Sequence, residues 1–185
     1  MDNGASSYRR FLDGDKDALT EIIREYKDGL ALFLAGYVND IVVAEELMED
    51  TFVRLYVRKP HFSEKSSFKT WLYAIGRNIA REYIRKNIKD RCSSLENLPE
   101  LTDGIYSTEA KILHDERHVA LHAALKRLKP EYYRVLWLCY FEDLTSDEIA
   151  KVMHKSRNNT FVYIHRAKKA LKDEMEKEGF TDENI

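Results

Sequence analysis

The sequence is poor in the residues that interrupt helices. Its 185 residues include only 3 prolines and 7 glycines, whereas 34% of them are charged. Proline lacks a backbone donor and glycine is costly inside an element, so their scarcity favours long helices joined by few turns. Hydrophobic residues make up 44% of the chain, which is enough for packed cores and excludes a globally disordered protein.

Cysteine is scarce too. Cys92 and Cys139 lie far apart, and neither belongs to a CxxC motif or to a Cys/His cluster. We therefore predict no zinc site and a reduced, cytoplasmic setting. His114, His118 and His122 do recur on one face of a predicted helix, but no carboxylate or thiol is paired with them, so no metal site is expected.

Long apolar runs and catalytic motifs are missing as well. No run of 18 uncharged apolar residues occurs, and the first residues, MDNGASSYRR, lack the apolar core of a signal peptide. We expect no membrane insertion. A glycine-rich phosphate loop, a nucleophile elbow and an acid–base pair of carboxylates are also absent from the sequence, so we expect neither an enzyme nor a cofactor.

Charge is present in quantity but is segregated along the chain. The net charge is only -2, yet residues 40–50 hold five acids and no base. Residues 77–91 hold six bases against two acids, and residues 151–172 hold seven bases and no acid. Local potential decides binding, so two basic patches separated by acidic surface indicate two nucleic-acid contacts and a further partner.

Apolar residues recur at helical spacing on both sides of one irregular stretch. Before it, the pattern predicts one or two helices in 8–36, a helix from 40 to about 58 that Pro60 ends, and a long helix around Trp71. The stretch SSLENLPELTDG has no sustained period and is typical of a linker. We predict an all-α protein of two small helical domains, 8–90 and 116–176, joined by a flexible linker, 91–115.

The predicted helix from 40 to 58 has an acidic outer face. The acids are Glu45, Glu46, Glu49 and Asp50, and the apolar side includes Leu47 and Phe52. Such a face is either ordinary solvated surface or a docking face, because charge of one sign steers association and fixes register. The residues alone leave both interpretations open.

The stretch from Phe62 to Lys86 combines aromatic and basic residues. Phe62 and Phe68 lie in a serine-rich segment, and single-stranded nucleic acid stacks on such rings with about 1–3 kcal/mol per base. The alternative is that these rings and Trp71 simply close the core. The helix that follows carries a polar face of Arg77, Asn78, Arg81, Arg85 and Lys86, which suits phosphates and base edges.

The C-terminal part predicts a helix-turn-helix. Thr145 and Glu148 have the spacing of a capping box, and a polar break at 154–156 separates two helical patterns. The second pattern buries Thr160, Ile164, Ala167 and Leu171, so its outer face is rich in basic and amide side chains. A basic second helix is the element that enters the major groove in proteins of this kind.

Three motifs in order resemble the bacterial sigma-70 factors of the small extracytoplasmic-function (ECF) group. AEELMEDTFVRLY (44–56) is similar to the helix that binds core polymerase, and FKTWLYAIGRNIAREYIRK (68–86) to the promoter-melting and −10 segment. LTSDEIAKVMHKSRNNTFVYIHRAKKAL (144–171) resembles the helix-turn-helix that reads the −35 element. The likeness covers most of the chain in the family's order and spacing.

The resemblance implies a subunit that gives RNA polymerase core its promoter specificity and assigns residues to three surfaces. Core polymerase would be bound by Glu45, Glu46, Leu47, Glu49, Asp50 and Phe52. The −10 element would be bound by Phe62, Phe68, Trp71, Arg77, Asn78, Arg81 and Arg85. The −35 element would be bound by Lys155, Ser156, Arg157, Asn158, Asn159, Phe161, Tyr163, Arg166 and Lys168. Promoter DNA and core polymerase are the expected partners; many relatives also have an anti-sigma factor, although nothing in this sequence requires one.

One departure from the family pattern concerns the turn. The family usually has Gly there followed by an apolar residue, and this chain has His154 and Lys155. The competing hypothesis is a stand-alone helix-turn-helix regulator that binds operators without polymerase. The acidic helix and the aromatic segment favour the sigma factor, because a simple repressor needs neither.

Overall fold

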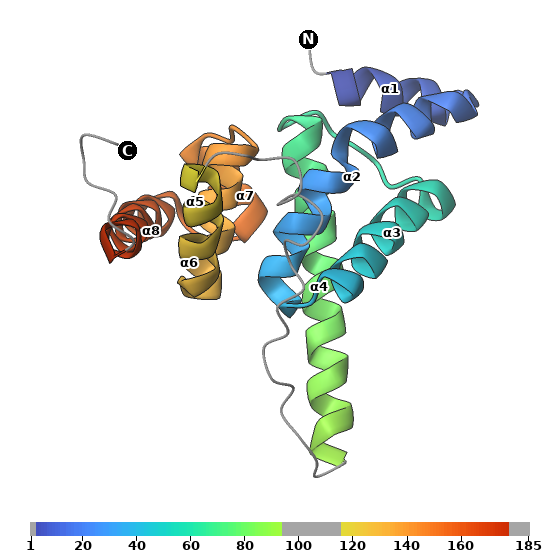
Figure 1. Cartoon of the computed structure of the whole chain (residues 1–185). Helices are drawn as coiled ribbons and strands as arrows, with labels where there is room; N and C mark the ends of the chain where they lie inside the picture. Colours follow the sequence, from blue (N-terminus) through green and yellow to red (C-terminus); the bar gives the residue numbers. More distant parts are fainter. Residues whose placement is uncertain (1–2, 94–115, 178–185) are drawn as a thin grey trace.

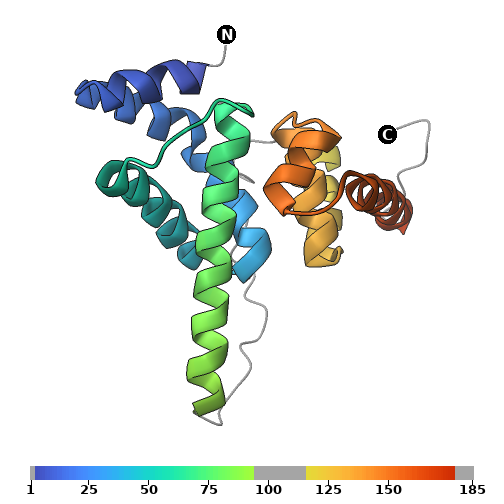
Figure 2. The same cartoon turned by 180° about the vertical axis from the view of Figure 1, so that it is seen from behind.

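The computed structural model describes residues 3–93 and 116–177, whose regular structure is entirely helical. The N-terminal unit comprises α1 (Asn3–Leu12), α2 (Lys16–Val38), α3 (Ile41–Arg58) and α4 (Phe68–Ser93). The C-terminal unit comprises α5 (Glu116–Arg127), α6 (Pro130–Leu136), a π-helical segment η3 (Trp137–Phe141), α7 (Ser146–Met153) and α8 (Arg157–Lys177). The all-α prediction is confirmed, and Figures 1 and 2 show the two units side by side.

The predicted boundaries shift at both ends of the first unit. α1 begins before residue 8, and α4 runs beyond residue 90 to Ser93. The rest of the predicted linker lies outside the described residues. Within the described ranges, no helix is both long enough and apolar enough to cross a membrane.

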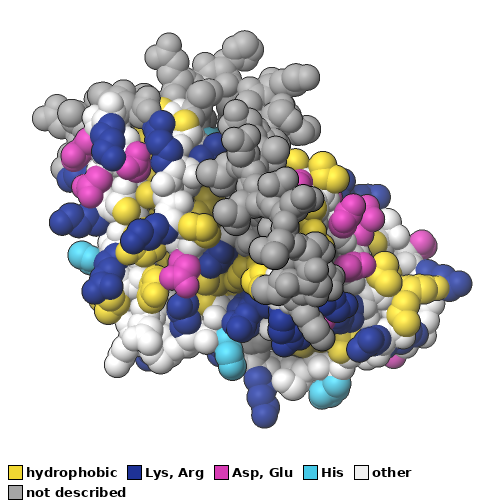
Figure 3. All heavy atoms as spheres, turned by 90° about the horizontal axis from the view of Figure 1, so that it is seen from below, with side chains coloured by type: hydrophobic (Ala, Val, Ile, Leu, Met, Phe, Trp, Pro, Cys, Tyr) yellow, Lys and Arg dark blue, Asp and Glu magenta, His cyan; other side chains and the backbone are white. Residues whose placement is uncertain are grey.

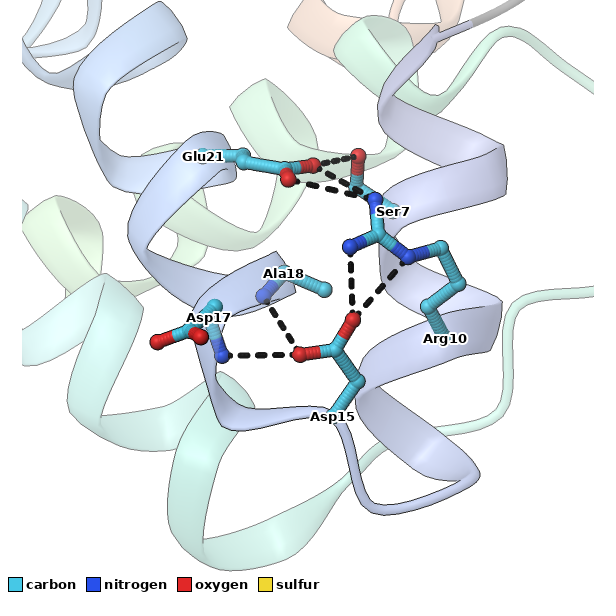
Figure 4. A network of polar contacts seen from close by, with 6 residues as sticks. All are labelled: Ser7, Arg10, Asp15, Asp17, Ala18 and Glu21. Carbon is cyan, nitrogen blue, oxygen red and sulfur yellow. Dashed lines mark hydrogen bonds and ion pairs between the residues drawn. The ribbon is translucent and has the colours of Figure 1, made fainter.

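A polar network joins the first two helices. The Asp15 carboxylate caps α2 by accepting hydrogen bonds from the amides of Asp17 (3.0 Å) and Ala18 (3.4 Å). The Arg10 guanidinium bridges Asp15 (2.6 Å) and Glu21 (2.9 Å), as Figure 4 shows. The hydrogen bond from Arg10 lowers the pKa of Asp15. Residues 8–36 therefore form parts of two helices, with the break between Leu12 and Lys16.

Local signals also set the ends of α3. Asn39 ends α2 in the left-handed conformation at φ 53°, and Asp40 caps α3 by accepting from the amide of Val42 over 2.9 Å. At the other end Lys59 is left-handed at φ 40°, immediately before Pro60. The predicted helix from 40 to about 58 is confirmed.

The core of the N-terminal unit lies between α2, α3 and α4. Its largest fully buried side chains include Tyr8, Ile22, Phe33, Leu55 and Leu72. The Tyr8 hydroxyl donates a hydrogen bond of 2.8 Å to the carbonyl of Pro60, and burial raises the pKa of Tyr8 to about 12. This bond ties α1 to the start of the connection between α3 and α4.

The C-terminal unit packs around η3. The amide of Glu142 donates to the carbonyl of Trp137 over 3.2 Å, which is the five-residue spacing of a π-helix. Trp137 stacks on Phe141 with ring centroids 4.3 Å apart, and Leu136 and Leu138 are fully buried beside it. Trp137 therefore belongs to the core of this unit.

The two units pack directly against each other, a point that the sequence left open. α6 lies against α2, where the Tyr133 hydroxyl donates to the carbonyl of Leu32 (3.1 Å) and the Trp137 indole donates to that of Gly29 (3.2 Å). α7 lies against α4, and Lys69 of α4 pairs with the buried carboxylate of Glu142 at 3.2 Å. The contact is both apolar and hydrogen-bonded.

Glycine makes this close approach feasible. A Cβ atom at Gly36 would lie 2.5 Å from a ring carbon of Tyr133 and 2.8 Å from a side-chain carbon of Arg134. A Cβ atom at Gly29 would likewise lie too close to the side chains of Glu142 and Tyr73. Both glycines lie on the face of α2 that meets the C-terminal unit.

Candidate nucleic-acid interface

The helix-turn-helix begins with the predicted capping box. Thr145 Oγ1 accepts a hydrogen bond from the Glu148 amide over 3.4 Å, and the Glu148 carboxylate accepts one from the Thr145 amide over 3.0 Å. The start of α7 thus satisfies amides that a helix end leaves unpaired.

The turn between α7 and α8 closes without glycine. His154 adopts the left-handed conformation at φ 52° and ψ 49°, and the Lys155 amide donates to the carbonyl of Ala150 over 3.0 Å. Ser156 Oγ then accepts from the amide of Asn159 over 3.3 Å at the start of α8. Histidine tolerates this conformation better than most residues, so the departure from the family pattern leaves a closed turn.

The outer face of α8 is the candidate −35 surface. Thr160 and Ala167 are buried against the rest of the unit, whereas Phe161 is 67% exposed. The other exposed members of the predicted set are Ser156, Arg157, Asn158, Asn159, Arg166 and Lys168. Arginine, lysine and asparagine are the residues that contact phosphates and base edges in the major groove.

Two members of that predicted set are engaged within the C-terminal unit instead. The Lys155 ammonium lies 4.2 Å from the centroid of the Tyr163 ring and 3.7 Å from a carboxylate oxygen of Glu131. Tyr163 itself packs edge-on against Tyr132. Both side chains are half-buried, and their assignment to the −35 element stays a prediction.

The polar face of α4 is the candidate −10 surface. Asn78, Arg81 and Arg85 are exposed there, as predicted. Arg77 differs from them, because the residue is only 8% exposed and burial lowers the pKa of its guanidinium; its assignment to the −10 element stays a prediction. Arg77 donates a hydrogen bond of 3.0 Å to the side-chain oxygen of Asn78.

The aromatic residues before and within α4 form a cluster. Phe68 is fully buried and packs between Tyr8 and Tyr26, which favours the core interpretation over a contact with DNA for this ring. Phe62 and Trp71 are half-buried, with ring centroids 5.1 Å apart. Only these two rings of the predicted set reach the surface.

α7 holds the segment that precedes α4. The Glu148 carboxylate accepts hydrogen bonds from Ser67 Oγ (2.7 Å) and Thr70 Oγ1 (3.2 Å), and Lys151 donates to the carbonyl of Lys65 (3.1 Å). Burial raises the pKa of Glu148, but the hydrogen bonds from Ser67, Thr145 and Thr70 outweigh it, so the pKa is lowered. The helix-turn-helix and the start of α4, which belong to the two candidate DNA-binding surfaces, therefore contact each other.

The outer face of α3 is the candidate polymerase-binding surface. Glu45, Glu46, Glu49 and Asp50 are exposed as predicted. Leu47 and Phe52 are 3% and 5% exposed, because they belong to the core, so little of either side chain is open to a docking partner. Phe52 nevertheless reaches the edge of a groove of about 560 Å³ that Glu45 and Glu49 also line.

Sequence reasoning missed the exposed apolar residues of α3. Val42, Val53, Tyr56 and Val57 are 61%, 56%, 52% and 70% exposed. The available signal was their spacing, since they fall outside the stripe of Leu47, Thr51 and Leu55 that faces the core. The surface thus combines acids with apolar side chains, as protein interfaces do.

Both units match known families, and so does the chain as a whole. Residues 22–89 match Sigma-70 region 2, and residues 118–171 match Sigma-70, region 4. The RNA polymerase sigma factor YlaC of Bacillus subtilis is 27% identical over 163 residues, covering 88% of this chain and 94% of that protein. The ECF sigma factor SigE of Mycolicibacterium smegmatis is 31% identical over 174 residues, covering 89% of this chain and 65% of that protein.

Solved structures show the same fold. The sigma factor RpoE of Bartonella quintana, in complex with the anti-sigma factor NepR, aligns with a TM-score of 0.70 at 18% identity, over 85% of this chain and 96% of that one. CnrH, in complex with the cytosolic domain of CnrY, aligns with a TM-score of 0.59 at 18% identity, over 91% of this chain and 92% of that one. With the two matched regions and the ECF relatives, the chain belongs to the sigma-70 family, in its extracytoplasmic-function group.

Proposed function

We propose that this protein binds bacterial RNA polymerase core and directs it to promoters through their −10 and −35 elements. The observation that carries the proposal is the order of region 2 and region 4 along one chain. The protein acts by binding rather than by catalysis, in the cytoplasm where the polymerase works. The charge segregation supports it, because an acidic face and two basic faces suit one protein partner and two DNA contacts.

The three surfaces divide the work in this proposal. The acids of α3, with the exposed Val53 and Tyr56 beside them, dock on the polymerase. Asn78, Arg81 and Arg85 of α4 hold the −10 strand, and Phe62 and Trp71 are the rings within reach of an unstacked base. The exposed face of α8 from Arg157 to Lys168 enters the major groove at the −35 element.

The proposal also includes a protein inhibitor, because the similar solved structures contain a bound partner. RpoE and CnrH were both solved with a regulatory partner, named as an anti-sigma factor in the case of NepR. A partner of that kind would compete for the surfaces that polymerase and promoter use.

The test is binding to purified core polymerase with a charge reversal on α3. Glu45→Lys with Glu46→Lys is expected to weaken core binding at least tenfold, because the docking charge changes sign. Asp13→Lys with Glu25→Lys is the matched control, since it changes net charge equally at exposed sites outside α3. Equal core binding by both double variants would contradict the assignment of α3 as the docking face. Absence of core binding by the unaltered protein would favour the hypothesis of a stand-alone regulator.

A further inference from the structure

A basic cavity lies between the two units, beside the surfaces already assigned. It has a volume of about 750 Å³ and is lined by α4 on one side and by α6 and the α7–α8 turn on the other. This is within the range of roughly 300–1,000 Å³ that small-molecule sites occupy. Figure 3 shows Lys and Arg side chains gathered on the face seen from below.

The charge of the cavity is almost entirely of one sign. Its lining includes the cations Arg77, Arg81, Arg85, Arg134 and Lys155. The lining holds one carboxylate, that of Glu131, which lies 3.7 Å from the Lys155 ammonium. Like charges gathered around one cavity repel, and an anion between them would relieve that repulsion.

The most buried cations have neutral partners. Arg134 donates to the carbonyl of Gly36 over 2.5 Å and lies 4.1 Å above the Tyr37 ring. Its Nε is buried and has no hydrogen-bond partner in the described part of the chain. Burial lowers the pKa of Arg134 and of Arg77, so both charges are held partly away from water. Neither guanidinium forms an ion pair with a carboxylate in the described part of the chain, so an anion in the cavity would meet two cations that are not already paired.

We propose that this cavity binds a compact polyanion that carries two or more phosphate groups, held between the arginines of α4 and Arg134 of α6. Guanidinium groups match phosphate oxygens with paired hydrogen bonds, and several of them converge on one space here. A space of about 750 Å³ is much smaller than a turn of duplex DNA.

Such a ligand would link the units and cover part of the −10 surface. It would hold α4 against α6 and occupy Arg81 and Arg85, so promoter binding would decrease while it is bound. That regulatory consequence rests on the proposed function, whereas the binding itself does not. Calorimetry on the full-length protein alone therefore tests the site separately from any transcription experiment.

The experiment titrates the protein with inorganic tripolyphosphate, orthophosphate and a poly-glutamate peptide at constant ionic strength. We expect saturable one-to-one binding of tripolyphosphate and at least tenfold weaker binding of orthophosphate and of the peptide. Arg134→Gln is expected to weaken tripolyphosphate binding about tenfold, whereas Arg24→Gln, on the exposed side of α2, leaves it unchanged.

A second variant is expected to raise the affinity for tripolyphosphate, an effect that a simple loss of packing would not produce. Glu131→Gln removes the one carboxylate of the lining and frees Lys155, so tripolyphosphate should bind severalfold more tightly. The proposal is overturned by an absence of saturable binding, by equal effects of the Arg134 and Arg24 variants, or by weaker binding to the Glu131 variant. Equal affinity for the peptide would also overturn it, in favour of an acidic protein ligand.

Discussion

His154 occupies a backbone conformation that glycine adopts without cost. Its φ of 52° places a Cβ in the left-handed region, which costs a non-glycine residue about 1–2 kcal/mol. His154→Gly is therefore expected to raise the free energy of unfolding by about 0.5–1 kcal/mol, allowing for glycine's greater freedom in the unfolded chain.

The control for this prediction is the same substitution within α8. His165 is exposed in a right-handed helix, so His165→Gly should lower the free energy of unfolding by about 1 kcal/mol. Chemical denaturation measures both. A loss of stability in the His154 variant would mean that the imidazole makes a contribution larger than the strain.

Glu148 gives the contact between the units a pH dependence. Its folded-state pKa lies below the usual value of 4.5, so its ionised form stabilises the folded state at higher pH. That contribution is present above the usual value and is lost as the pH falls through the folded-state pKa.

We therefore expect the denaturation midpoint to fall as the pH decreases below 4.5, and to fall less in Glu148→Gln over the same interval. Glu25→Gln is the matched control, because Glu25 is exposed on α2. Identical pH profiles for the unaltered protein and the Glu148 variant would contradict the role given to this carboxylate.

At the scale of single elements, α4 carries the proposed strand contact. Arg81→Ala with Arg85→Ala should weaken promoter binding and opening at least tenfold while leaving core binding intact. The slope of log affinity against log salt should decrease by about 1.5, since two phosphate contacts are lost.

The control for α4 is Lys16→Ala with Arg24→Ala, which removes two exposed cations from α2. Promoter binding at several salt concentrations and core binding by the same proteins are the measurements. If the α4 variant lost core binding as strongly as promoter binding, these arginines would not act on DNA alone.

Elements with local signals were predictable from the sequence, and residues that depend on long-range packing were not. Pro60 and the Thr145–Glu148 pair each act on their own helix end, and both predictions were confirmed. Phe68 could have been placed in the core, because it precedes the buried Leu72 by one helical turn. Arg77 could not, because its burial depends on contacts that its own helical pattern does not reveal, such as the one with Tyr37 of α2.

The whole molecule depends on the close approach of α2 and α6. Gly29 and Gly36 lie seven residues apart on one face of α2. This spacing of small residues in the sequence indicated that something packs closely on that face, but it did not identify the partner. Gly36→Ala places a methyl group against Tyr133 and Arg134, so the two units should separate and the radius of gyration should increase.

Small-angle scattering measures that change. Gly76→Ala is the control, because the added methyl group meets Leu30 within the N-terminal unit and should lower stability without separating the units. An unchanged radius of gyration in the Gly36 variant, with unchanged stability, would mean that the contact between α2 and α6 is not what holds the units together.

Promoter-directed initiation is the central claim, and run-off transcription tests it most directly. Purified bacterial core polymerase is supplied with fragmented genomic DNA from the organism that encodes this protein, with and without the protein. The account predicts discrete transcripts that appear only when the protein is present. No transcripts, together with tight duplex binding by the protein alone, would contradict it.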